Sequence, residues 1–205
     1  MAGLRGDVDN LLRRYRELTL SGSKKTNLVS RRDVQKTVDS LVSESLLPLG
    51  WEGWHFESPL LDIGSGAGIP GIPLRIAKPE LCVILLDSNR RKTLFLRKAV
   101  MMLGLDGVEV VQGRAEDFAR NVLYLSHFNT VVSRATSSLS DLTSWGDALL
   151  KPGGELIVWK GSRVREELAQ LDSSGWSEPV VRAQENGLTL VKLQKGGGEC
   201  ESVKV

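Results

Sequence analysis

The feature that most constrains this chain of 205 residues is a short apolar run that ends in a cluster of glycines. The run covers residues 60–63, and the cluster consists of Gly64, Gly66, Gly68 and Gly71. This order is typical of a β-strand, a tight turn and the start of a helix. Glycine lets the backbone approach a ligand without a Cβ in the way, and the free N–H groups at a helix start can bind it. The segment therefore predicts a ligand-binding turn at the end of a strand.

The glycines alone do not identify the ligand. Residues 66–71 fit the G-x-G-x-x-G pattern of dinucleotide-binding turns, whereas residues 64–68, preceded by Asp62, fit the looser G-x-G-x-G turn of S-adenosylmethionine enzymes. A carboxylate at position 62 can accept a hydrogen bond from a cationic amine, such as that of S-adenosylmethionine, but would repel a pyrophosphate. Asp62 therefore favours S-adenosylmethionine as the cofactor.

Composition indicates an ordinary globular protein. Hydrophobic residues make up 41% of the chain and charged residues 25%, which suits one domain, and the net charge of +2 neither requires nor excludes nucleic acid. Cys82 and Cys200 have neither disulfide-framework spacing nor metal-ligand neighbours, so we expect reduced thiols and no metal. The sequence has no signal peptide pattern and no apolar run of about 20 residues, so we expect a cytoplasmic protein with no membrane partner.

The first 58 residues predict a helical cap and a linker that form part of the same compact unit as the rest. Residues 7–20 carry apolar side chains at helical spacing, and a second helix is expected to begin at Asp33 and end before Pro48. A polar loop over residues 21–27 would join the two helices. The aromatic residues between positions 50 and 58 are expected to pack the cap onto the core rather than bind a base.

Strand and helix patterns alternate from the glycine turn onward. The sequence predicts a turn at residues 151–154, a closing hairpin over residues 178–183 and 188–194, and five earlier strands over residues 60–63, 81–86, 108–112, 128–133 and 155–159. The fold class predicted is α/β, a three-layer Rossmann-like methyltransferase fold with a seven-stranded, mostly parallel sheet and an N-terminal helical cap. The domain would cover residues 59–195, and residues 196–205 are expected to be a disordered tail.

One helix in this pattern has a predicted inward face. It follows Asp87, begins with Ser88 or Asn89 as its cap and ends at Gly104. Its inward residues are expected to be Leu94, Phe95, Ala99 and Met102.

Charged side chains follow the predicted parallel strands at the points where the strands end. Asp87 ends the second strand, Glu116 follows the third, and Arg134 and Lys160 follow the fourth and fifth. Because the carboxyl ends of parallel strands share one edge, where open α/β sheets bind ligands, these residues should converge around a nucleoside. Asp87 is expected to accept hydrogen bonds from ribose hydroxyls. A dehydrogenase would need a further substrate domain, so the count of elements favours methyl transfer.

Five segments together resemble the glucose-inhibited division protein B family. They are residues 61–74 (LDIGSGAGIPGIPL), 86–92 (LDSNRRK), 114–116 (RAE), 133–135 (SRA) and 159–161 (WKG). The resemblance covers about residues 7–194. It implies an enzyme that uses S-adenosylmethionine to methylate N7 of a specific guanine in the decoding region of 16S ribosomal RNA, with S-adenosylhomocysteine as the other product.

The resemblance also implies roles for individual residues. Gly64, Ile69, Ala115, Glu116 and Arg134 would bind the cofactor, and Asn27 and Leu28 would border the target guanine. With the residues already argued from the turn and the strand ends, the predicted cofactor site comprises Asp62, Gly64, Gly66, Gly68, Ile69, Asp87, Ala115, Glu116 and Arg134.

The chemistry requires no general base, because guanine N7 carries a free lone pair at neutral pH. The rate should come from proximity and orientation, which can supply about 7–11 kcal/mol. Arg134, Lys160 and Asn27 are the predicted substrate-positioning residues, and the two cationic ones would hold the cofactor carboxylate, guanine O6 or a neighbouring phosphate. The basic residues predicted to bind RNA are Lys24, Lys25, Arg31, Arg32, Arg90, Arg91, Arg163 and Arg165.

Two other functions remain open from the sequence. The chain could be a non-catalytic ribosome-binding or assembly factor that retains the cofactor fold, since fold does not fix function. It could also be a nicotinamide-dependent oxidoreductase that uses residues 66–71 and Asp87. The expected partner is 16S ribosomal RNA or the small ribosomal subunit, and the expected state is a monomer.

Overall fold

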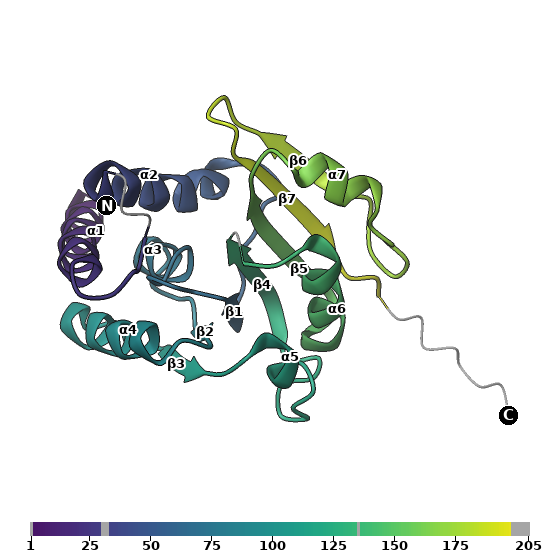
Figure 1. The fold of residues 1–205 in the computed structure, drawn as a ribbon, viewed down its shortest axis with the longest axis horizontal. Coiled ribbons are helices and arrows are strands. Elements are labelled where there is room, and N and C mark those ends of the chain that lie inside the picture. Colours follow the sequence, from purple (N-terminus) through teal and green to yellow (C-terminus); the bar gives the residue numbers. More distant parts are fainter. Residues whose placement is uncertain (1, 30–32, 135, 198–205) are drawn as a thin grey trace, which may run out of the picture.

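A single seven-stranded sheet forms the centre of the molecule (Figure 1). The computed structural model describes residues 2–29, 33–134 and 136–197. In the order β3-β2-β1-β4-β5-β7-β6, the strands are β3 (Val108–Gln112), β2 (Val83–Asp87), β1 (Leu60–Ile63), β4 (Phe128–Arg134), β5 (Leu150–Lys160), β7 (Thr189–Gln194) and β6 (Val180–Ala183). The first five strands in this order pair in parallel, and β7 pairs antiparallel with both β5 and β6. The predicted mostly parallel sheet with a closing hairpin is confirmed.

Helices cover both faces of the sheet. On one face lie α1 (Ala2–Ser23), α2 (Val34–Leu46), α3 (Gly71–Ala77) and α4 (Arg90–Leu103), and on the other α5 (Ala115–Phe118), α6 (Leu139–Leu149) and α7 (Val164–Ala169) (Figure 1). Side chains of β1 alternate between the two layers: Leu60 belongs to the core cluster on the α1 side, and Leu61 to the cluster on the α6 side. Both leucines are fully buried, which is why the strands read as continuous apolar runs.

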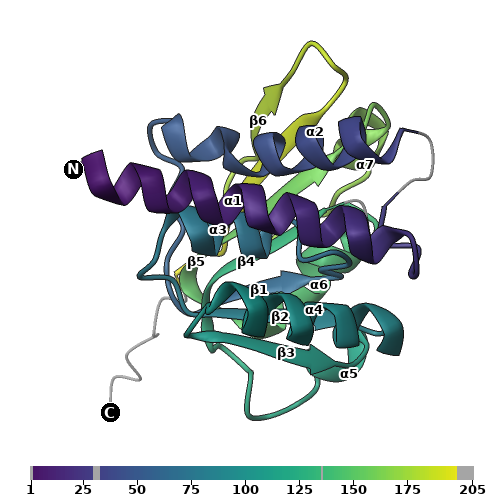
Figure 2. The ribbon, with the colours of Figure 1, turned by 90° about the vertical axis from the view of Figure 1, so that its left-hand side faces the viewer.

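The N-terminal helices pack across α3 and α4 (Figure 2). Leu12 and Tyr15 of α1 and Val38 of α2 share one core cluster with Leu60 of the sheet. The Tyr15 hydroxyl donates a 2.8 Å hydrogen bond to the carbonyl of Ala67 in the glycine turn. The cap therefore contacts the turn directly and is not a separate lobe.

The second cap helix and the linker agree with the sequence prediction. Asp33 caps α2, its carboxylate accepting a 3.2 Å hydrogen bond from the N–H of Lys36, and a short 3-10 helix (Leu47–Gly50) follows. Trp54 and Phe56 of the linker are buried in the core, as expected for packing residues. None of the helices in the described part of the chain has the length and apolarity needed to span a membrane.

Three details of the prediction were wrong. Helix α1 continues to Ser23, into the predicted polar loop, and β5 begins at Leu150, so residues 151–154 are part of a strand and not a separate turn. Those four residues form a bulge, because Leu150 pairs with Phe128 while Glu155 pairs with Thr130.

The third error concerns the inward face of α4. Its buried residues are Thr93, Leu96, Ala99 and Leu103, whereas Leu94 is 53% exposed and Met102 is 43% exposed. The caps of α4 were correct: Asn89 accepts hydrogen bonds from the N–H groups of Arg91 and Lys92, and Gly104 ends the helix in the left-handed conformation. Apolar residues lie on more than one side of this helix, so the sequence pattern alone did not identify its buried face.

Candidate functional site

A cavity of about 510 Å³ opens at the carboxyl ends of the central strands. It adjoins the point where the strand order reverses between β1 and β4, which is where ligands bind in open α/β sheets. Its size suits a small-molecule ligand. Its lining residues come from the segments that follow four parallel strands and from α6, and they are Ile63, Gly64, Leu86, Asp87, Ser88, Asn89, Lys92, Gly113, Arg114, Ala115, Glu116, Thr136, Ser137 and Trp145.

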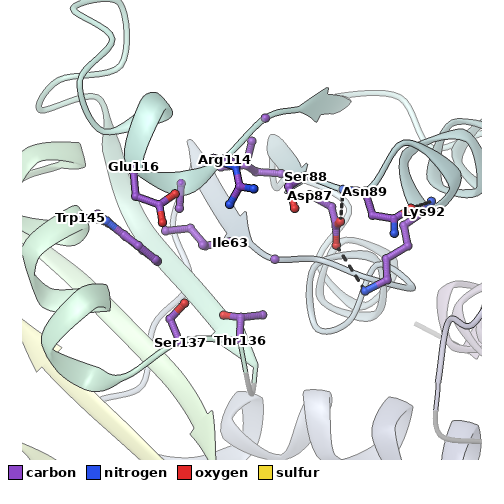
Figure 3. A pocket seen from close by; sticks show the side chains of 14 residues that line it. Ile63, Asp87, Ser88, Asn89, Lys92, Arg114, Glu116, Thr136, Ser137 and Trp145 are labelled. Carbon is purple, nitrogen blue, oxygen red and sulfur yellow. Dashed lines mark hydrogen bonds and ion pairs between the residues drawn. The ribbon is translucent and has the colours of Figure 1, made fainter.

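Asp87 is held in this cavity by hydrogen bonds to both of its carboxylate oxygens (Figure 3). One carboxylate oxygen, Oδ2, accepts a 2.9 Å hydrogen bond from the N–H of Gly66, and Oδ1 accepts a 2.8 Å bond from the N–H of Asn89. The Nζ atom of Lys92 lies 3.9 Å from Oδ2. Each carboxylate oxygen has two lone pairs, so Asp87 keeps acceptor capacity for hydroxyl donors of a ligand.

Gly64 and Thr136 pack closely together in the cavity wall. Its φ of +71° lies in the left-handed region, and an added Cβ would stand 2.2 Å from Cγ2 of Thr136. Thr136 is itself held by a 2.6 Å hydrogen bond between its hydroxyl and that of Ser133. Only glycine fits at position 64, and the wall formed by Gly64 and Thr136 depends on it.

Asp62 lies beneath the glycine turn and does not line the cavity. Its side chain is fully buried, and Oδ2 accepts a 2.9 Å hydrogen bond from the N–H of Gly71. The other oxygen, Oδ1, has no hydrogen-bond partner among the described residues. Burial raises the pKa of Asp62 to about 7, although the hydrogen bond from Gly71 lowers it. In this structure Asp62 braces the turn from below.

Replacing Asp62 by asparagine is expected to flatten the pH dependence of stability between about pH 4 and pH 7. Because the pKa of Asp62 is raised in the folded state, the folded protein binds more protons than the unfolded chain in this window. Wild-type stability should therefore fall as pH rises through the window, and the variant should lack that part of the slope. Urea denaturation at several pH values measures the effect, and an unchanged slope in the variant would contradict it.

The predicted cofactor residues divide into two groups. Gly64, Asp87, Ala115 and Glu116 line the cavity, whereas Ile69 is buried in the core cluster on the α1 side. The N–H of Gly66 helps to hold Asp87 in place through its hydrogen bond to that carboxylate. The carbonyl of Gly68 accepts a 2.7 Å hydrogen bond from the N–H of Ile72 and so joins the turn to the start of α3. The remaining predicted cofactor residues, Asp62 and Arg134, lie outside the cavity lining.

Arg134 and Lys160 do lie together, in a separate cavity. Arg134 forms an ion pair with Glu44 of α2. Lys160 is 7% exposed, and its Nζ contacts the carbonyl of Ser137 and lies 2.7 Å from Glu167 of α7. Lys160 therefore ties the segment after β4 to α7.

The predicted RNA-binding residues that the structure describes are exposed. Lys24 and Lys25 lie in the turn after α1, Arg90 and Arg91 at the start of α4, and Arg163 and Arg165 at the start of α7. Asn27 is also exposed, and Leu28 beside it is buried. Arg31 and Arg32 lie outside the described residues.

Several lining residues were not predicted from the sequence. Neither Lys92 of α4 nor Trp145 of α6 was a predicted site residue. Figure 3 shows Trp145 and Glu116 on the opposite side of the cavity from Lys92. The proximity of Lys92 to Asp87 follows from its place one turn into a helix that begins just after β2, a spacing that was available in the sequence.

The lining fits S-adenosylmethionine. Asp87, at the end of β2, can accept hydrogen bonds from ribose hydroxyls. Gly64 has no side chain, so a ligand can contact the main chain directly at this part of the cavity wall. Trp145 and Ala115 provide apolar surface for a base, with the carboxylate of Glu116 beside them. Across the described ranges, no group of three or more acidic, histidine or cysteine side chains is placed to hold a metal ion.

Comparison with known proteins gives one consistent result. A family model described as rRNA small subunit methyltransferase G matches residues 9–189. A Marinobacter nauticus protein named Ribosomal RNA small subunit methyltransferase G is 42% identical over 154 residues, which are 75% of this chain and 68% of that protein. A Neisseria meningitidis serogroup B protein of the same name is 38% identical over 176 residues, which are 85% of this chain and 81% of that protein.

Solved structures share the fold at low sequence identity. A candidate O-methyltransferase from Klebsiella pneumoniae superimposes with a TM-score of 0.59 at 13% identity, covering 91% of this chain and 90% of that one. Precorrin-6y C5,15-methyltransferase from Geobacter metallireducens gives a TM-score of 0.53 at 16% identity, covering 82% of this chain and 90% of its own. At these identities the similarity shows a common methyltransferase architecture and nothing about substrate.

Proposed function

The chain belongs to the rRNA small subunit methyltransferase G family, and from this premise we propose that it transfers a methyl group from S-adenosylmethionine to N7 of one guanine in the decoding region of 16S ribosomal RNA. It is a methyltransferase with a Rossmann-like fold. The observation that carries the proposal is the anchored carboxylate of Asp87 in a cavity at the switch point of the sheet. Its cellular location would be the cytoplasm, where the small ribosomal subunit is assembled.

The proposed cofactor contacts are those of the cavity lining. Asp87 would accept hydrogen bonds from the ribose, Ala115 and Glu116 would flank the adenine with Trp145, and the main chain at Gly64 would border the methionine part. When bound, S-adenosylmethionine supplies an electrophilic methyl group. The predicted contacts of Asp62, Gly66, Gly68 and Ile69 would then be indirect, since these residues shape the turn that carries Gly64.

The protein's task in such a reaction is to position its reactants. Guanine N7 is already nucleophilic at neutral pH, so no residue has to remove a proton. Lys160 and Arg134 would act near the acceptor nucleotide, with Asn27 at the same edge of the sheet. Proximity and orientation of this kind can lower a barrier by about 7–11 kcal/mol.

The exposed basic residues provide a candidate RNA surface around this edge. Turns and helix starts that border the carboxyl ends of the strands carry Lys24, Lys25, Arg90, Arg91, Arg163 and Arg165. Lysine and arginine on such a surface bind phosphates regardless of sequence, so these residues would hold the RNA while another part of the site selects the base. The chain would act as a monomer on the RNA or the small subunit.

We expect labelled methyl transfer from S-adenosylmethionine to unmodified 16S RNA or small subunits, followed by a single borohydride and aniline cleavage in the decoding region. That cleavage marks 7-methylguanosine. Fully modified RNA, on which the acceptor is already occupied, is the control and should take up no label. Label on another base, or no incorporation by a protein that binds S-adenosylmethionine, would contradict the proposed acceptor.

A further inference from the structure

Another cavity lies on the side of the cap, at the ends of β4 and β5. Its volume is about 310 Å³, and it lies between the end of α2, the ends of β4 and β5, and the β6–β7 turn. Arg134 lines this cavity, whereas Thr136, two residues further along the chain, lines the cofactor cavity. Among the described residues, the two spaces have no lining residue in common, and a third cavity of about 580 Å³ shares Thr136 and Ser137 with the cofactor cavity and Lys160 and Gly161 with this one.

The guanidinium of Arg134 is held on one side only. Its Nη2 forms an ion pair with Oε2 of Glu44, and the two side chains are 15% and 12% exposed. The other terminal nitrogen, Nη1, is buried and has no hydrogen-bond partner among the described residues. Buried donors normally have acceptors, so Nη1, which borders the cavity, is available to donate to an oxygen of a bound reactant.

Glu44 is itself fixed by three elements. Its Oε1 accepts a 2.7 Å hydrogen bond from the hydroxyl of Ser40 and a 2.8 Å bond from Nδ2 of Asn186 in the β6–β7 turn. Its main-chain carbonyl accepts a 2.9 Å bond from Nε1 of Trp159 at the end of β5. The carboxylate therefore has little freedom, and the position of Arg134 is set by the cap helix.

We propose that Glu44 is a positioning residue for methyl transfer, which holds Arg134 through Nη2 so that Nη1 binds an anionic oxygen of a bound reactant. This inference rests on the proposed function. The interaction is a charge-assisted hydrogen bond from the guanidinium of Arg134 to an anionic oxygen, which is a strong type of hydrogen bond in proteins. Two reactants carry such an oxygen: the cofactor, in its carboxylate, and the RNA, in the phosphates next to the target guanosine.

The first test is Glu44→Gln, which keeps the side-chain volume and leaves the main-chain bond to Trp159 in place. We expect kcat/KM for methyl transfer to fall at least tenfold with an unchanged melting temperature of the core. Glu17→Gln is the matched control, because Glu17 also forms an ion pair on a cap helix but is 60% exposed. The control should have wild-type activity.

A double-mutant cycle distinguishes positioning from a general structural effect. If Glu44 acts through Arg134, Glu44→Gln should have almost no further effect on kcat/KM in an Arg134→Ala background. Multiplicative losses in the double variant would show that the two residues act independently, and the proposal would be overturned.

Binding measurements identify the source of the oxygen. S-adenosylhomocysteine has the carboxylate and its decarboxylated analogue, S-adenosyl-3-thiopropylamine, lacks only that group, so calorimetry of both ligands isolates it. If the carboxylate is the partner, Glu44→Gln should lose the preference for S-adenosylhomocysteine. If an RNA phosphate is the partner, that preference should persist while the KM for RNA rises.

A variant that keeps both the ligand preference and the KM for RNA would overturn the inference. Failure of the proposed function is separate, because it would appear as absent N7 methylation by the wild-type protein. In that event binding still decides, since a Glu44→Gln variant that keeps both the ligand preference and the wild-type affinity for 16S RNA would overturn the inference.

Discussion

Replacing Asp87 by alanine is expected to weaken S-adenosylmethionine binding by about 100-fold or more. Hydrogen bonds to a charged group contribute about 1.5–3 kcal/mol each, and two ribose hydroxyls would lose their acceptor. The N–H groups of Gly66 and Asn89 would also lose theirs, so the turn that forms the cavity wall would loosen. Calorimetry with S-adenosylhomocysteine measures the loss.

Two further variants make this result specific. Asp87→Asn keeps the volume and one acceptor for the turn, and should retain the fold while losing most of the affinity. Asp106→Ala is the control, because it removes an exposed carboxylate beyond the other end of α4. The hydrogen bonds from Arg75 to this residue go to its main-chain carbonyl, which the substitution keeps. It should bind like the wild type. Wild-type affinity in both Asp87 variants would exclude this carboxylate from the site.

Replacing Gly64 by alanine is expected to cost several kcal/mol of stability and to abolish cofactor binding. The positive φ alone costs about 1–2 kcal/mol for a residue with a Cβ, and the contact with Thr136 at 2.2 Å adds a steric clash with the wall of the cavity. Chemical denaturation gives the free energy of unfolding, and calorimetry gives the affinity.

Gly53 provides the matched control for the clash. Its φ is +75°, close to that of Gly64, but an added Cβ would meet nothing within 4 Å. Gly53→Ala should therefore show only the cost of the positive φ. Thr136→Ser removes the clashing methyl group and keeps the hydroxyl that bonds Ser133, so it should partly rescue Gly64→Ala. Equal losses in Gly53→Ala and Gly64→Ala would show that the close contact has no consequence.

Features that depend on local sequence were predictable. The strands were predictable because parallel strands buried on both faces are continuous apolar runs, and the position of Asp87 at the cavity followed from its place at the end of one of them. The caps of α4 were equally local, since Asn89 and Gly104 act on the adjacent helix ends.

Features that depend on distant packing were not predictable. Arg134 was placed at the correct edge of the sheet, but its partner Glu44 is 90 residues away in the sequence, and no local pattern connects them. The buried face of α4 is determined by its packing against α1 and the sheet, which buries Leu96 and leaves Leu94 exposed. Trp145 fitted the periodicity of a core residue, and only the tertiary structure shows it at the cavity.

The bonds between α1 and the rest of the molecule also set an order of events during synthesis. Tyr15 bonds to Ala67, and the side chain of Arg14 bonds to the carbonyl of Met102, 88 residues later in the chain. Proteins emerge from the ribosome N-terminus first, so α1 cannot make both bonds until α4, which contains Met102, has also been made. Until then the part of α1 that packs on α4 is exposed to solvent and to chaperones. Helix α1, which bonds to the glycine turn through Tyr15, is thus made well before α4 and completes its contacts only when α4 is present.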